Sequence, residues 1–152
     1  MISQKCQYAL RAVFELAKSA RSGPCLLKIE HIAKAQKIPV RFLENILNQL
    51  RTGGFVASRR GRCGGYLLAR DPADITVGEI IRFMDGPLED IAGSGMTSRR
   101  RLGPEDEVFS QIWLRAGTAL ATVLDQPTLA DLVEEFHRLQ PPGLHHNPDY
   151  VI

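Results

Sequence analysis

The chain has 152 residues, 44% hydrophobic and 24% charged, as expected for a globular protein with an apolar core. It has no run of about 18 apolar residues and no secretory signal, so we expect a cytoplasmic protein that crosses no membrane. Three scattered cysteines argue against a disulfide framework. The net charge is +10 for residues 1–70 and −8 for residues 71–152. A segregated basic half is typical of nucleic-acid binding, although a solvated basic face has the same composition.

Three helices are predicted in the basic half from the spacing of apolar residues. The first covers residues 3–20, where Leu10 and Phe14 add a second apolar strip and predict contacts on two sides. Two shorter helices are expected at 28–35 and 39–52, separated by a tight turn, which is helix-turn-helix spacing. The inward face of the later helix is expected to carry Phe42, Leu43, Ile46, Leu47 and Leu50.

A β-hairpin is predicted next. Residues 55–58 and 66–69 have the composition of short strands, and the string RRGRCGG between them is a glycine-rich, cationic turn. Together they form a wing with a basic tip.

The acidic half begins with a helix at about 76–84, started by a capping box of Thr76 and Glu79. Residues 86–104 show no periodicity and are expected to form a flexible loop. A small-molecule effector or a partner could bind this loop, but its composition identifies neither.

A long helix is predicted over residues 105–124, and Thr128 is expected to start a last helix. One face of the long helix has apolar residues at steps of three and four, a heptad-like seam suited to pairing with a second copy of the chain. This predicted dimer interface comprises Phe109, Ile112, Ala116, Ala119 and Val123.

The predicted fold is therefore mainly α-helical with a small β-hairpin wing. A winged helix-turn-helix DNA-binding domain covers residues 1–85, a flexible loop 86–104, dimerisation helices 105–139 and a disordered tail 140–152.

The chemistry of the basic half predicts contacts with duplex DNA. Arginine pairs with guanine, asparagine with adenine, and glutamate accepts from cytosine in the major groove. The outward positions of the 39–52 helix offer these side chains, although a solvated polar face is the alternative. The candidate base readers are Val40, Arg41, Glu44, Asn45 and Asn48.

The wing tip predicts the clearest DNA contact. Arg59, Arg60 and Arg62 lie close together, and like charges repel unless an anion is near. Gly61 and Gly64 permit a tight turn and a close approach to a phosphate or a narrow minor groove. Further candidate phosphate contacts, for which plain surface charge is the alternative, are Lys5, Tyr8 and Lys28.

Several strings in the chain resemble a known family. KCQYALRAVFELA, FLENILNQLRTGGFVASRRGRCGGYLLARDPADITVGEIIRFMDG and TLADL are similar to bacterial IscR/CymR/NsrR-type regulators, the Rrf2 family. The likeness is close over residues 1–86 and looser over 105–138. It implies a homodimeric winged helix-turn-helix repressor or activator on a pseudo-palindromic operator. By position, it places Arg41, Glu44 and Asn45 at bases and Arg60 and Gly61 in the minor groove.

Many members of this family hold an iron–sulfur cluster through three cysteines before the long helix. Here residues 86–104 contain neither cysteine nor histidine, and Cys6, Cys25 and Cys63 fall on separate predicted elements. A cluster needs several thiolate or similar ligands. We therefore expect no cofactor and no metal site. The resemblance then points to the cluster-free branch, which includes a regulator of cysteine metabolism that receives its signal through a partner enzyme.

Cys63 lies beside Arg62 in a turn that is expected to be exposed. Reactive cysteines are typically exposed and lie in electropositive surroundings. One hypothesis is therefore that oxidation of Cys63 weakens DNA binding.

Two other classes of function remain to be weighed. A winged helix can dock to another protein, with the acidic half recruiting the partner. An enzyme is not indicated, because no paired carboxylates, Ser–His–Asp pattern or phosphate-binding loop is recognisable. The string GRCGG lies in a predicted hairpin and not at a strand-to-helix turn, so it does not resemble a P-loop.

Overall fold

The computed structural model describes residues 1–92 and 103–142. The central part of the predicted flexible loop, 93–102, and the predicted disordered tail from residue 143 lie outside the described residues. The predicted class, mainly helical with one hairpin, is confirmed. The elements in chain order are α1 (Gln4–Ala20), α2 (Ile29–Gln36), α3 (Val40–Thr52), β1 (Val56–Arg59), β2 (Gly65–Leu68), the 3₁₀ turn η1 (Pro72–Asp74), α4 (Val77–Asp85), α5 (Leu88–Ala92), α6 (Pro104–Leu124) and α7 (Leu129–Leu139).

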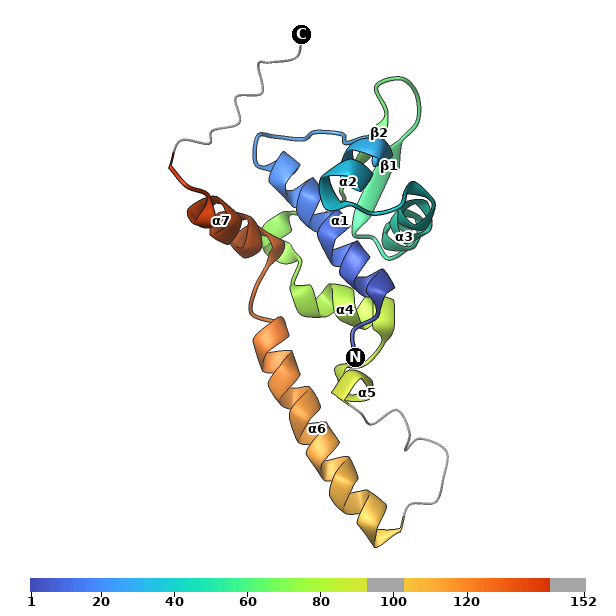
Figure 1. Cartoon of the computed structure of the whole chain (residues 1–152), viewed down its shortest axis with the longest axis vertical. Helices are drawn as coiled ribbons and strands as arrows, with labels where there is room; N and C mark the ends of the chain where they lie inside the picture. Colours follow the sequence, from blue (N-terminus) through green and yellow to red (C-terminus); the bar gives the residue numbers. More distant parts are fainter. Residues whose placement is uncertain (93–102, 143–152) are drawn as a thin grey trace.

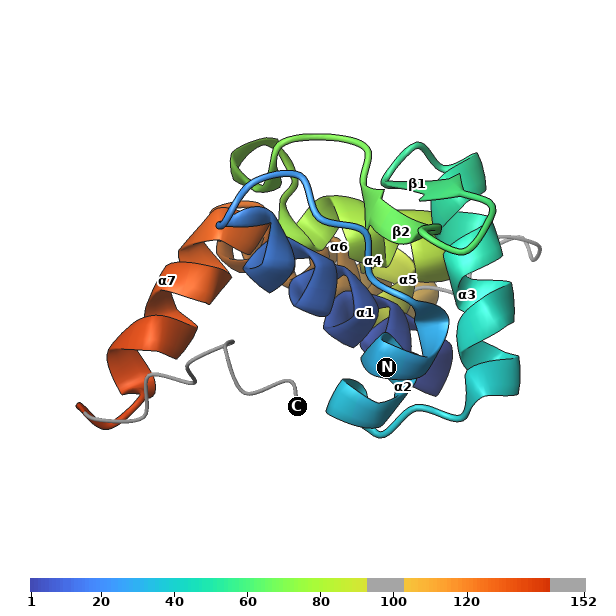
Figure 2. The same cartoon turned by 90° about the horizontal axis from the view of Figure 1, so that it is seen from above.

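Helix α1 is the centre of the molecule. It contacts α2, α3, α4 and α7, with α3 and the hairpin on one side and α7 on the other (Figure 2). The predicted second apolar strip explains this position, because the ring of Phe14 packs edge-on against Phe136 of α7 at 5.6 Å. On the other side, Ala9, Ala12 and Val13 are fully buried in a core shared with the neighbouring helices.

The hairpin pairs antiparallel, with Val56 opposite Leu68 and Arg59 opposite Gly65. A third segment joins it, because the backbone of Leu27 exchanges hydrogen bonds of 2.7 and 2.8 Å with Tyr66. The hairpin is therefore anchored to the chain that enters α2, and only its tip projects freely.

Part of the predicted flexible loop is helical, so that prediction was wrong for residues 88–92. Leu88 is buried in the core. Gly117 of α6 leaves room for α5, since a Cβ there would lie 2.9 Å from the Cα of Glu89. Five residues are too few to show helical periodicity, and tertiary packing decides their structure.

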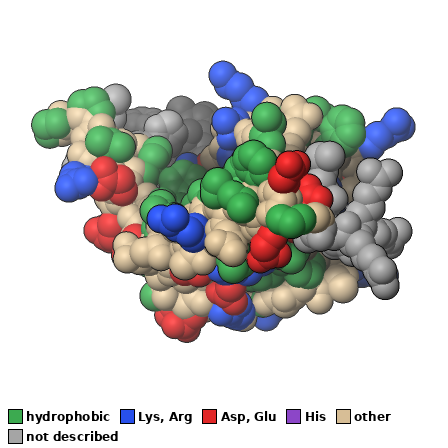
Figure 3. Space-filling model, turned by 90° about the horizontal axis from the view of Figure 1, so that it is seen from below, with side chains coloured by type: hydrophobic (Ala, Val, Ile, Leu, Met, Phe, Trp, Pro, Cys, Tyr) green, Lys and Arg blue, Asp and Glu red, His purple; other side chains and the backbone are tan. Residues whose placement is uncertain are grey.

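Helix α6 extends away from the other helices, with α5 beside it (Figure 1). Hydrophobic side chains gather on the end of the molecule where α6 begins, with acidic side chains next to them (Figure 3). No helix in residues 1–92 and 103–142 is long and apolar enough to cross a membrane.

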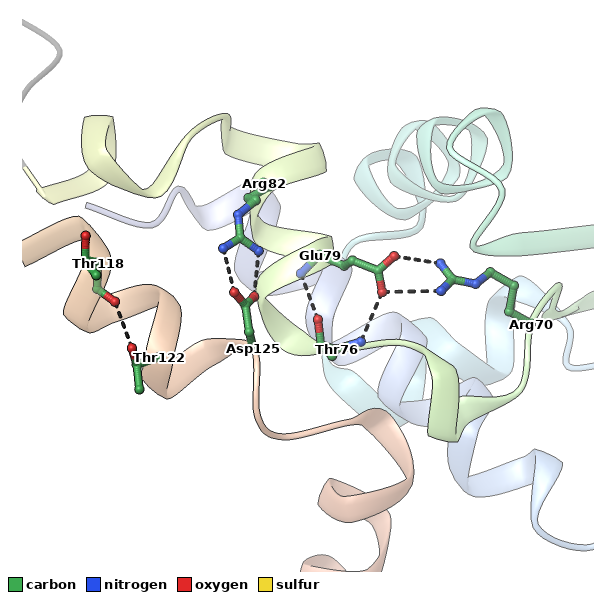
Figure 4. Close-up of polar contacts among 7 residues, drawn as sticks. All are labelled: Arg70, Thr76, Glu79, Arg82, Thr118, Thr122 and Asp125. Atoms are coloured by element: carbon green, nitrogen blue, oxygen red, sulfur yellow. Dashed lines mark hydrogen bonds and ion pairs between the residues drawn. The ribbon is translucent and has the colours of Figure 1, made fainter. Parts of the chain in front are cut away.

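Two ion pairs fix α4 (Figure 4). Arg82 donates to both oxygens of Asp125, at the end of α6, at 2.6 and 2.7 Å. Arg70 donates to Glu79 at 2.9 Å, and Glu79 also completes the predicted capping box with Thr76. The guanidinium partners lower the pKa of both carboxyls.

Candidate nucleic-acid interface

Helix α3 presents a polar arc to solvent because its apolar residues fall on one side. Leu43, Ile46, Leu47 and Leu50 are buried against α1 and the hairpin. The structure therefore exposes every predicted base reader on this helix: Val40, Arg41, Glu44, Asn45 and Asn48. One prediction about this helix was wrong. Phe42 is 59% exposed and does not belong to the inward face.

The wing tip has the geometry that its glycines predict. Gly61 has φ +108°, a left-handed conformation that favours glycine, and a Cβ on Gly64 would overlap the carbonyl oxygen of Arg59. The tight turn leaves Arg59, Arg60 and Arg62 exposed at the end of the hairpin. Three guanidinium groups in so short a turn create a local positive potential.

A groove of about 450 Å³ lies between the wing and α3. Its walls include Glu44 and Asn48 of α3 and Arg59 and Arg60 of the wing. The groove brings the predicted helix and the predicted wing to one surface.

Arg51 also lines this groove and was not among the residues predicted from the sequence. It donates to the hydroxyl of Ser58 at 3.3 Å, a contact that links the end of α3 to β1. Lys28, the residue that precedes α2, lines the same groove. No side chain caps the start of α2. Uncapped N–H groups at a helix start attract an anion.

A second groove, of about 660 Å³, lies on the other flank of α3. Lys5 and Tyr8 of α1 line one wall, and Asn45 and Gln49 of α3 line the other. Phe42 also lines it. Gln49 was missed, although it occupies an outward position by the same helical spacing that selected Asn45.

The start of α1 is held in place by α4. Ser3 caps α1 by accepting from the N–H of Cys6 at 3.0 Å, and its own N–H and hydroxyl donate to Asp85 at 2.6 and 2.5 Å. These bonds position the first turn of α1, which carries Lys5, beside α3.

The cysteines do not fit an iron–sulfur cluster. Cys6 is buried in the core, where burial and the nearby Asp85 carboxylate raise the pKa of its thiol to about 12. Cys25 and Cys63 are exposed on separate turns. Within residues 1–92 and 103–142, no three His, Cys, Asp or Glu side chains are grouped to hold a metal ion. Residues 93–102 contain none of these four residue types.

The fold and the exposed cationic face define a winged helix-turn-helix protein of the DNA-binding class. Residues 2–135 match the Rrf2 family, described as an iron-dependent transcriptional regulator. The chain belongs to the Rrf2 family of DNA-binding transcriptional regulators.

Similar proteins agree with this assignment. An Rrf2-like HTH-type transcriptional regulator of Rhodobacter capsulatus is 42% identical over 88% of this chain and 92% of its own length. The structure of CymR, the global cysteine regulator of B. subtilis, superposes with a TM-score of 0.72 at 35% identity, covering 89% of this chain and 97% of CymR. The structure of T. potens IscR gives a TM-score of 0.74 at 32% identity, covering 94% and 93%.

Proposed function

We propose that this regulator acts as a homodimeric repressor on a pseudo-palindromic operator, with α3 in the major groove and the wing in the adjacent minor groove. One observation carries the proposal: Glu44 and Asn48 on the outward arc of α3 border the same 450 Å³ groove as Arg59 and Arg60 of the wing. A helix fits the major groove, and an arginine fits a narrow minor groove. In this arrangement residues 1–85 bind DNA, and residues 105–139 provide dimerisation.

The base-reading set occupies the exposed arc of α3. Arg41 is suited to guanine, Asn45 and Asn48 to adenine, and Glu44 to the amino group of cytosine. Val40 offers an apolar contact at the first turn. Phosphate contacts surround this set, and they include the predicted Lys5, Tyr8, Lys28, Arg59 and Arg62 as well as Arg51.

The exposed seam of α6 supports the homodimer. Phe109, Ile112 and Val123 are 58%, 46% and 65% exposed, and they share one face with Ala116 and Ala119. A different face of α6, at Gly117, is covered by α5. Pairing of two α6 seams would bury this stripe and place two copies of α3 on one duplex, as an inverted-repeat operator requires.

Regulation of this dimer is proposed to come from a partner enzyme or a small-molecule effector in the cytoplasm.

Cys63 offers a redox input, because its exposed thiol lies beside the arginines of the wing. Operator affinity of the Cys63→Ser variant and the parent, measured with and without hydrogen peroxide, tests this input. Equal losses of affinity in both proteins would exclude it.

Selection of duplexes from a random-sequence pool tests the proposed function. We expect enrichment of an inverted repeat whose half-sites are about one helical turn, or a multiple of it, apart. No enrichment after repeated rounds would contradict the proposal and favour the alternative of a protein-docking module.

A further inference from the structure

Phe42 is a large apolar side chain at an unexpected place. It lies in the first turn of α3, at the edge of the arc that carries the proposed base readers, and it is 59% exposed. Single exposed apolar residues are common on protein surfaces. Phe42, however, lines a 660 Å³ groove that is walled on its other side by Tyr8 and Lys5 of α1.

The two flanks of α3 differ in chemistry. The wing-side groove is lined from α3 by the charged residues Glu44 and Arg51, and Asn48 lines both grooves. The α1-side groove is lined from α3 by the ring of Phe42, by buried Ile46 and by amide side chains. One of these amides, Asn45, lies one helical turn from Phe42. An aromatic ring beside an amide suits an A·T pair. In the major groove thymine presents its apolar C5-methyl group, and adenine can form two hydrogen bonds with asparagine.

Resting on the proposed function, we propose that the α1-side flank of α3 selects an A·T pair. Phe42 contacts the thymine methyl, and Asn45 accepts from and donates to the adenine edge. Duplex DNA is a better occupant of this groove than a free apolar ligand because Lys5 places a cation at its rim.

Replacement of thymine by deoxyuridine tests this inference directly, because the two bases differ in major-groove chemistry only by the methyl group. The operator is first obtained by selection, and each thymine is then replaced in turn. We expect one position in each half-site at which the loss of the methyl weakens binding by about fourfold, the value for one buried methyl group.

The Phe42→Ala variant provides the second half of the test. It should bind the thymine operator about fourfold more weakly than the parent does and should be indifferent to deoxyuridine at the same position. Phe42→Leu, which keeps apolar contact, should retain part of the methyl effect. Since the ring is largely exposed, melting temperatures of both variants should stay near that of the parent.

Arg41→Ala is the matched control on the same helix. It should weaken operator binding but keep the fourfold methyl effect. The inference is overturned if deoxyuridine is tolerated at every position, or if the methyl effect persists in Phe42→Ala. Failure to select any duplex would instead overturn the proposed function, and the inference with it, so the two failures are distinguishable.

Discussion

Helices α3 and α6 are both amphipathic, yet their uncovered faces differ. In α3 the leucines and Ile46 are buried, and the uncovered arc offers arginine, asparagine and glutamate side chains. In α6 the covered face meets α5, and the uncovered face carries Phe109, Ile112 and Val123. The difference shows how one chain can address two partners, since polar groups suit the edges of bases and an apolar stripe suits a second copy of itself.

The largest effect should follow from placing a charge on the α6 seam. Ile112→Glu would bury two carboxylates at a dimer interface, so we expect a monomer. Operator affinity should fall by about 100-fold or more, because the second half-site would no longer be bound from the same molecule. Sedimentation and operator binding measure both effects. Gln111→Glu adds the same charge at an exposed neighbouring position and should remain dimeric. If Ile112→Glu is also dimeric, α6 does not form the dimer interface.

A smaller effect is expected on the polar arc of α3. Asn45→Ala should weaken binding by about 1–3 kcal/mol at its cognate base pair and relax the preference there. Selection with the variant protein measures the change. If the selected sequence is unchanged, Asn45 does not read a base.

The phosphate contacts of the wing should contribute affinity without sequence preference. Arg59→Ala should weaken binding of all duplexes by about eightfold at 100 mM salt and reduce the salt slope by about one. Titrations at several salt concentrations give both values. Arg21→Ala removes the same charge from the far end of α1, where Arg21 pairs with Glu134 at 3.6 Å, and should leave both values unchanged.

The smallest effect concerns the ion pair between Arg82 of α4 and Asp125 at the end of α6. Arg82 holds the pKa of Asp125 below its ordinary value of 3.8. The ion pair therefore stabilises the fold above that value, and its contribution is lost as the pH falls through the lowered pKa. Because both side chains are 41% exposed, we expect less than about 1 kcal/mol.

Denaturant unfolding at pH 7 and pH 3 measures this contribution. Asp125→Asn should lower the free energy of unfolding at pH 7 and flatten its decrease with acid. Glu134→Gln, which alters a more exposed carboxylate, is the matched control. An equal decrease with acid in Asp125→Asn and the parent would contradict the role of the pair.

Much of this architecture could be predicted from the sequence, because long amphipathic helices and a glycine-rich turn leave strong local signals. The apolar spacing predicted α1, α3 and α6, and the string RRGRCGG predicted the wing. Two features could not be predicted in this way. Helix α5 depends on packing against Gly117, and the exposure of Phe42 depends on where α1 lies. Both are set by tertiary contacts between segments distant in the sequence.

The same limit applies to the candidate site. Spacing alone selected the outward residues Arg41, Glu44 and Asn45, and the structure exposes all three. Arg51 was missed because its contribution depends on the position of β1, whose Ser58 accepts its hydrogen bond.

The affinity of the full chain for its selected duplex, measured from 50 to 200 mM salt, tests the central claim most directly. An interface formed by the cationic face of α3 and the wing should make about 6–10 phosphate contacts, so affinity should fall by about 10³ to 10⁵ across this range. An affinity that stays constant across the range would contradict a DNA-binding role for this face.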